Sequence, residues 1–136
     1  MKPWWWSVLG TLLLAGTAGA GQMVGGPCRY DDFPGQAAIV AVTPQAGDKR
    51  LEVTFTFTPD RPLKGDPFYV PGKIWHLTLT GGKAPGPRCI KTYGIRAGRH
   101  LPSRMRLIRK GTCTPVLFDF PGIDLTDDPD ARPEGQ

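Results

Sequence analysis

Several residue types on which common functions depend are scarce or missing in this chain of 136 residues. Asparagine is absent, which excludes N-glycosylation. The sequence has two histidines, two serines and no C-x-x-C pair, so it lacks the ligand spacing of a zinc site and offers little support for nucleophilic catalysis. We therefore expect a protein that binds a partner, without enzymatic activity and without a cofactor.

Apolar residues form a long run only at the N-terminus. A positive residue, Lys2, is followed by an apolar stretch that starts at Trp4, and small residues precede an expected cleavage after Ala20. This three-part order is typical of a secretory signal peptide, here residues 1–20. The alternative is an uncleaved membrane anchor, but the stretch is short for a span, which needs about 20 apolar residues. We expect an exported protein, periplasmic or extracellular, with no transmembrane segment after cleavage.

The rest of the chain is long enough for one domain and too short for two. Residues 21–36 are rich in glycine and polar side chains, which predicts an irregular N-terminal arm. Residues 37–121 carry the alternating apolar pattern of a β domain. From residue 122 onward this pattern ends and acidic residues dominate, so residues 122–136 are predicted to form an acidic disordered tail.

Short strands account for the apolar pattern, and no segment has a convincing helical period. The clearest strand is 51–58, in which four apolar residues alternate with polar ones on the opposite face. That strand and residues 38–43, joined by a short turn, should form a hairpin. Further strands are predicted at 74–80, 89–95, 105–110 and 116–120. The sequence thus predicts an all-β fold of about five to seven short antiparallel strands, either a small OB-like barrel or a sandwich.

The three cysteines all follow the predicted signal peptide, and an exported protein meets an oxidising environment. If strand 89–95 runs antiparallel to strand 105–110, Cys89 lies opposite residue 111 and close to Cys113. We therefore predict a disulfide between Cys89 and Cys113, with Cys28 left free. The alternatives pair Cys28 with Cys113 or with Cys89, because spacing alone does not determine connectivity.

Charge is divided unevenly along the sequence. Nine basic residues and no acidic one lie between Lys83 and Lys110, although the net charge of the whole chain is only +5. Within this segment, the candidates for binding a polyanion are Arg96, Arg99, Arg104, Arg106 and Arg109.

Arginine suits phosphate and carboxylate groups because its planar guanidinium can donate two parallel hydrogen bonds. The predicted partner is an anionic lipid, an acidic glycan or an acidic protein of the cell envelope, and nucleic acid is not expected outside the cell. The alternative is a solvated strand face whose charge is neutralised by the acidic tail or keeps a sheet edge from aggregating.

Two other functions are compatible with the sequence. The first is a copper-handling protein, because copper accepts the ligand types of His76, His100, Met105 and Cys113. Their order along the chain differs from that of blue-copper sites, so a metal site is not the main prediction. The second is a structural protein that is cross-linked to a partner through the unpaired Cys28.

Overall fold

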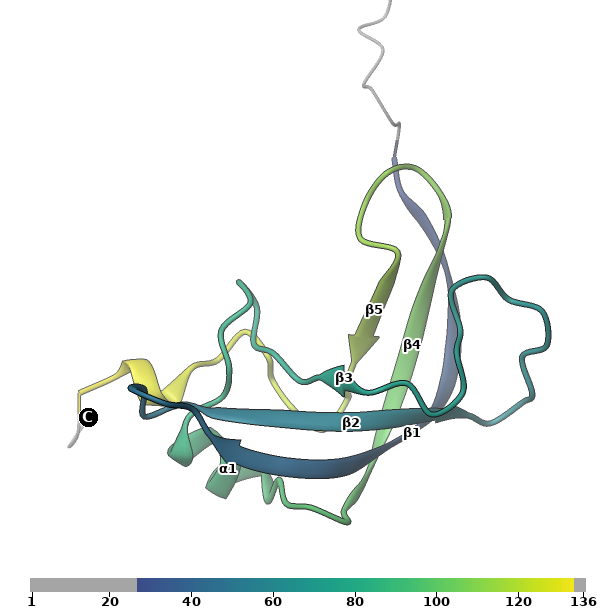
Figure 1. Cartoon of the computed structure of the whole chain (residues 1–136). Helices are drawn as coiled ribbons and strands as arrows, with labels where there is room; N and C mark the ends of the chain where they lie inside the picture. The colour runs from purple at the N-terminus through teal and green to yellow at the C-terminus, as the bar shows by residue number, and fades with distance from the viewer. Residues whose placement is uncertain (1–26, 134–136) are drawn as a thin grey trace, which may run out of the picture.

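Five antiparallel strands form one sheet, accompanied by a short helix. A computed structural model of the chain describes residues 27–133; residues 1–26, which include the predicted signal peptide, and residues 134–136 lie outside the described part. The strand order across the sheet is β3-β2-β1-β4-β5 (Figure 1). The all-β prediction is confirmed, and so is the hairpin, which β1 and β2 form. The strand bounds are β1 Arg29–Pro44, β2 Leu51–Pro59, β3 Trp75–His76, β4 His100–Lys110 and β5 Val116–Asp119.

The sheet is strongly curled because its long central strand is shared between two partners. β1 pairs with β4 along residues 29–38 and with β2 along residues 35–44, so the two pairings overlap in only a few residues. A bulge at Val40 interrupts the β1–β2 register, and bulges increase the local twist of a strand. Figure 1 shows β4 and β5 rising away from the direction of β2, so that the sheet forms an open half-barrel.

The two edges of the half-barrel meet through aromatic side chains. Phe118 on β5 packs against Trp75 on β3 and against Phe55 on β2, in both cases with ring centroids 5.0 Å apart. Such pairs contribute about 0.5–1.5 kcal/mol beyond the area that they bury. Side chains therefore join the two edges where backbone hydrogen bonds do not. The second sheet that a sandwich needs is absent from residues 27–133.

The apolar core lies on the inner face of the curl. The alternation predicted for residues 51–58 is confirmed, because Val53, Phe55 and Phe57 are buried. Met105 and Leu107 of β4 are fully buried opposite them. Burial of each such side chain stabilises the fold by about 1.5–3 kcal/mol relative to exposure, so this face sets the register of the central strands.

Residues 89–95, predicted to be a strand, are mostly helical. The helix α1 spans Pro87–Tyr93 and ends at Gly94, whose backbone is left-handed with a φ of 61°. Proline at the first helical position and glycine just after the last one are the usual limits of a helix. The strand prediction was wrong because a few apolar residues over seven positions fit either period. No helix within residues 27–133 is long and apolar enough to cross a membrane.

Of the segment predicted to be an irregular arm, residues 29–36 form the first half of β1, and residues 21–26 lie outside the described part. Residues 29–36 pair with β4, which places Phe33 opposite Met105. Pro34 and Gly35 disfavour a strand locally, yet both lie inside it. Gly35 packs so closely on β2 that a side chain there would overlap its backbone. The pairing with β4 thus overrides local propensity.

The acidic C-terminal segment is folded over α1, at least as far as residue 133, and is not disordered there. It contains a short 3-10 helix, η1 Pro129–Ala131, that contacts α1. The carboxylate of Asp130 accepts hydrogen bonds from the backbone N–H groups of Arg88 at 2.9 Å and Cys89 at 3.1 Å. These N–H groups lie in the first turn of α1 and have no partner within the helix. The segment therefore caps a helix and does not cover the arginines of β4.

A disulfide joins Cys28 to Cys113, so the predicted bridge between Cys89 and Cys113 is wrong. The prediction failed because β4 pairs with β1 and β5 and not with residues 89–95. Cys89 is the unpaired cysteine and is fully buried. Burial, followed by the negative charge of Asp130, raises the pKa of the Cys89 thiol to about 11, which makes it a poor nucleophile at neutral pH.

Candidate functional site

The five arginines proposed to bind a polyanion do not form one patch. Their positions are β4 for Arg104, Arg106 and Arg109, the turn before β4 for Arg99, and the loop after α1 for Arg96. Arg99 donates to the carbonyl groups of residues 93 and 94, at the C-terminal end of α1. Arg96 is exposed and makes no ion pair with a described residue. The structure thus separates these two from the three on β4.

Two of the arginines on β4 are neutralised by aspartates of neighbouring strands. Arg104 pairs with Asp119 of β5 at 2.9 Å, and Arg106 pairs with Asp32 of β1 at 3.0 Å. Asp32 also lies 3.9 Å from Arg104, so acids and bases alternate across the outer face of the sheet. The hydrogen bond to Asp119 raises the pKa of Arg104. Exposed pairs of this kind contribute about 0–1 kcal/mol each, but they leave no surplus positive charge.

Arg109 is held by two carboxylates at once. Its guanidinium lies 2.7 Å from Asp66 and 3.0 Å from Asp31. Partial burial opposes ionisation of Asp66, but hydrogen bonds from Arg109 and from the N–H of Phe68 lower the pKa of this carboxyl. Arg109 therefore ties the loop after β2 to the sheet instead of facing solvent as a free cation.

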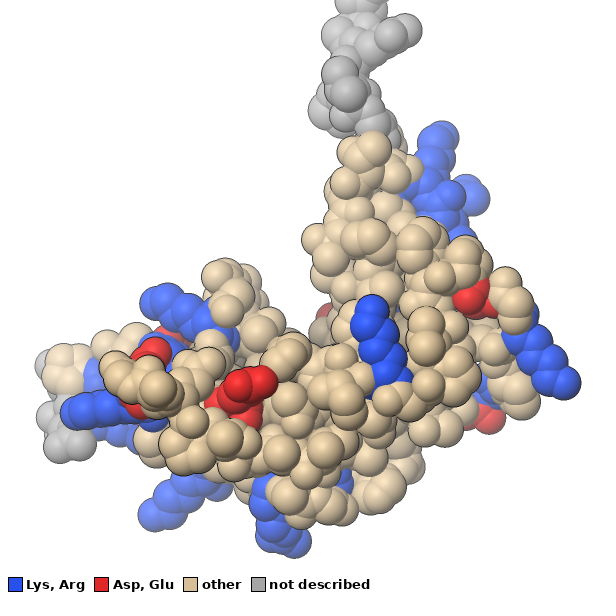
Figure 2. Space-filling model, in the orientation of Figure 1, with Lys and Arg blue, Asp and Glu red and all other residues tan. Residues whose placement is uncertain are grey.

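Two basic residues at the far end of the β1–β4 pair have no acidic partner within residues 27–133. Arg29 begins β1 and lies directly opposite Lys110, which ends β4. Both are exposed, and neither makes an ion pair with a described residue. The disulfide and a hydrogen bond of 2.8 Å from the hydroxyl of Tyr30 to a turn carbonyl hold this end together. We call residues 28–30 and 110–114 the ribbon tip; Figure 2 shows Lys and Arg side chains projecting from this end of the molecule.

The residues proposed as copper ligands are spread over the fold. Cys113 is in the disulfide, Met105 is fully buried in the core, and His100 is exposed at the start of β4. His76 on β3 lies 3.3 Å from Glu52 of β2. Within residues 27–133, no three histidine, cysteine or acidic side chains are grouped as a metal site requires. The predicted copper ligands are therefore not brought together. The cross-linking alternative needs a free Cys28, but this cysteine is in the disulfide with Cys113.

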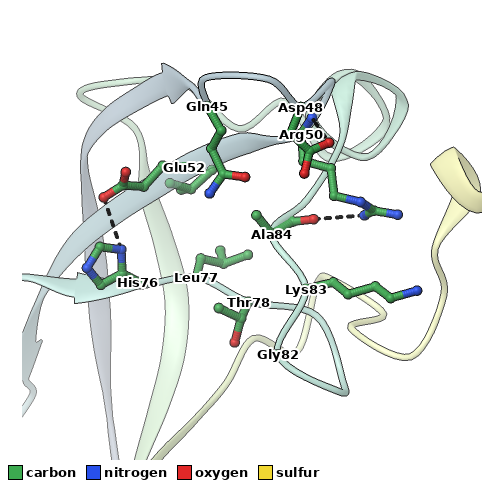
Figure 3. A pocket seen from close by; sticks show the side chains of 11 residues that line it. Gln45, Asp48, Arg50, Glu52, His76, Leu77, Thr78, Gly82, Lys83 and Ala84 are labelled. Carbon is green, nitrogen blue, oxygen red and sulfur yellow. Dashed lines mark hydrogen bonds and ion pairs between the residues drawn. The ribbon is translucent and has the colours of Figure 1, made fainter.

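A hollow of about 480 Å³ opens beside β2, where the chain leaves the sheet after β3. Figure 3 shows Leu77 near its centre, with Glu52 and His76 at one side and Gln45 and Ala84 around the rest. The volume lies within the range of ligand pockets, which is roughly 300–1,000 Å³. We call it the β2 hollow.

Arg50 fixes one wall of the β2 hollow. Its guanidinium donates to the carbonyl of Ala84 at 2.8 Å and to both carboxylate oxygens of Asp128, at 2.8 and 3.2 Å. The hydrogen bond between them raises the pKa of Arg50 and lowers the pKa of Asp128. The two side chains are only 18% and 19% exposed, so solvent and salt screen this pair less than the pairs on β4.

Sequence reasoning missed the ribbon tip, the β2 hollow and the capping aspartate. A signal for the tip was present, because Arg29 follows one cysteine directly and Lys110 lies close to another. The hollow had no comparable signal, since its wall depends on a contact between residues 34 positions apart. The capping role of Asp130 also had no local signal, because Asp130 lies 41 positions from Cys89, from whose N–H it accepts a hydrogen bond.

Comparison with known proteins does not supply a function. The chain matches no protein-family model, no curated protein and no solved structure. The fold class by itself does not define an activity, because one architecture serves many unrelated functions. Function is therefore inferred from the residues and their geometry.

Proposed function

We propose that this protein is a small exported binding module that attaches to an anionic surface of the cell envelope through the ribbon tip. The observation that carries the proposal is the cross-strand pair of Arg29 and Lys110, which lacks an acidic partner among the described residues. Like charges directly opposite each other in a sheet are destabilising. An anionic partner relieves this repulsion, so the energy that the pair costs in the free protein favours binding.

The contrast with the neighbouring arginines supports the assignment to the tip. Arg104, Arg106 and Arg109 are each within 3.0 Å of an aspartate, so an anion that approaches them competes with an existing partner. In the described part of the chain, Arg29 and Lys110 have no such competitor. The disulfide beside them also keeps the two cations together, which reduces the entropy lost when both are engaged.

The partner that we propose is an anionic phospholipid surface. β1 begins at the tip, so the preceding chain, with the predicted signal peptide at residues 1–20, is attached at the same end of the domain. We propose that, while that apolar segment remains attached, the tip faces the membrane. A Lys or Arg near an anionic leaflet contributes about 1 kcal/mol, so the pair supplies about 2 kcal/mol of weak, salt-sensitive attachment.

The test is co-sedimentation of the exported protein with vesicles of phosphatidylglycerol and phosphatidylcholine, compared with vesicles of phosphatidylcholine alone. Replacing both cations, Arg29→Ser with Lys110→Ser, should lower partition onto the anionic vesicles about 30-fold. Arg61→Ser with Lys64→Ser is the matched control, because it removes the same charge from an exposed loop. The control should lower partition by less than about threefold, through the net charge alone.

Two outcomes would contradict this proposal. Equal losses in the two double variants would mean that net charge, and not the tip, determines binding. Retention on an acidic glycan without any binding to anionic vesicles would replace the lipid surface by a glycan as the partner. Thermal unfolding should show neither variant to be less stable than the unsubstituted protein, because neither removes a buried contact or an ion pair. The tip variant should be slightly more stable, because it loses the repulsion between Arg29 and Lys110.

A further inference from the structure

On the side of β2 that faces the β2 hollow, the backbone N–H of Val53 has no acceptor among the described residues. The N–H of Leu77 donates to the carbonyl of Val53 at 2.9 Å, but the reciprocal bond of a regular antiparallel pair is not formed within the described residues. In a strand, the N–H and C=O of one residue point the same way, and Val53 lines the hollow. Val53 is only 1% exposed, and a buried N–H without a partner is costly. An oxygen that enters the hollow therefore gains a ready donor.

The side chains around this donor supply both kinds of hydrogen-bonding group above an apolar floor. Gln45 provides an amide, and Figure 3 shows its side chain directed into the hollow from the β1–β2 turn. Glu52 provides a carboxylate, and its contact with His76 uses one of its two oxygens. Leu77, 2% exposed, forms the floor between them. A ligand that fits must therefore donate, accept and present an apolar face.

The formal charges around the hollow cancel. Two acids, Asp48 and Glu52, and two bases, Arg50 and Lys83, line it. Arg50 is in addition committed to Asp128 and to a backbone carbonyl. A strongly anionic ligand is repelled by Glu52 and a cation is repelled by Lys83, so neither sign of charge is favoured.

We infer that the β2 hollow binds one neutral sugar unit. A pyranose ring has a face of C–H groups that suits Leu77 and hydroxyl groups that both donate and accept hydrogen bonds. In this arrangement a hydroxyl oxygen accepts from the N–H of Val53, and another hydroxyl donates to the free oxygen of Glu52. The wall held by Arg50 is formed without the ligand, so little ordering is needed on binding. This inference is independent of the ribbon tip.

The experiment is a titration of the ¹⁵N-labelled protein with glucose and with N-acetylglucosamine, followed by NMR. The amides of Val53 and Gln45 should show the largest saturable shifts with at least one of the two sugars, with millimolar affinity. Glu52→Gln keeps the shape and removes the charge, and should weaken binding about tenfold. Gln45→Trp fills the hollow and should abolish the shifts. Gln36→Trp, an exposed position on β1, is the matched control and should leave them unchanged.

Each remaining outcome overturns the inference. The hollow is not a sugar site if neither sugar moves the Val53 amide, or if Gln45→Trp binds as well as the unsubstituted protein. It is an ionic site instead if inorganic phosphate or acetate shifts this amide and the sugars do not. The Arg29→Ser, Lys110→Ser double variant must bind the sugar normally, which separates this test from that of the proposed membrane attachment.

Discussion

The two ends of this domain are held together by different forces. At the ribbon tip, a disulfide joins the start of β1 to the turn after β4. At the opposite end, which we call the helix end, α1, η1 and the β1–β2 turn are joined without a covalent link. There Asp130 caps α1 through two backbone hydrogen bonds, and Asp128 pairs with Arg50. The cysteine at the helix end, Cys89, is buried and unpaired.

This difference explains where the charge of the protein remains available. At the helix end, acidic side chains already make contacts that stabilise the fold. They accept hydrogen bonds from backbone N–H groups and pair with an arginine that is mostly buried. At the ribbon tip, the disulfide holds the two segments together, so Arg29 and Lys110 are not needed for stability. The end that is linked covalently can therefore carry a repulsive pair of charges, and we assign binding to it for that reason.

Of the changes that test this difference between the two ends, removing the disulfide should lower the free energy of unfolding most. The bridge spans 85 positions, and closing a loop of that length constrains the unfolded chain by about 4.5 kcal/mol in the chain-entropy treatment. Cys28→Ser with Cys113→Ser should lower the free energy of unfolding by about that amount in urea titrations. Reduction of the unsubstituted protein is the control and should give the same value. A loss below about 1 kcal/mol would mean that non-covalent contacts already hold the ribbon tip.

The strongest non-covalent link of the helix end is the cap that Asp130 provides. Asp130→Ala leaves the N–H groups of Arg88 and Cys89 without their acceptor and should lower the free energy of unfolding by about 2 kcal/mol. Asp127→Ala is the matched control, because Asp127 pairs with the exposed Arg132 and should cost less than about 0.5 kcal/mol. Equal losses in chemical denaturation would show that general charge, and not the cap, stabilises this end.

The parts of the fold that were predicted from the sequence are those with strong local patterns. β2 was identified because its apolar residues alternate strictly, and its inward face is buried as expected. The first half of β1 was missed because Pro34 and Gly35 contradict a strand locally. α1 was missed because the cap of its N-terminus comes from Asp130, far along the chain, and not from a residue just before the helix.

The candidate sites were harder to predict, because charge and cavities depend on pairing partners. The arginines of β4 are an unbroken basic run in the sequence, yet Asp31 and Asp32 neutralise two of them across a strand pair that was predicted to be an arm. The disulfide was misassigned for the same reason, since the strand next to β4 was not identified. The sequence alone does not show which distant strands pair or in what register. That register determines which basic side chains lie next to an acidic one.

The smallest expected effect concerns the pH dependence of the link between Arg50 and Asp128. The pKa of Asp128 is lowered in the folded state, chiefly by its hydrogen bond from Arg50, so its stabilising contribution is present above the unfolded pKa of about 3.9 and is lost as the pH falls through the folded pKa. Asp128→Asn should therefore lower stability by about 1 kcal/mol at neutral pH. The loss should shrink as the pH falls below the unfolded pKa and vanish once the pH is below the lowered pKa of the folded state, where the native carboxyl is itself protonated. Urea titrations across this range measure the difference, with Asp60→Asn as a control at an exposed aspartate that has no described ion pair. A loss that is the same at every pH would mean that the shape of this side chain, and not its charge, holds the helix end together.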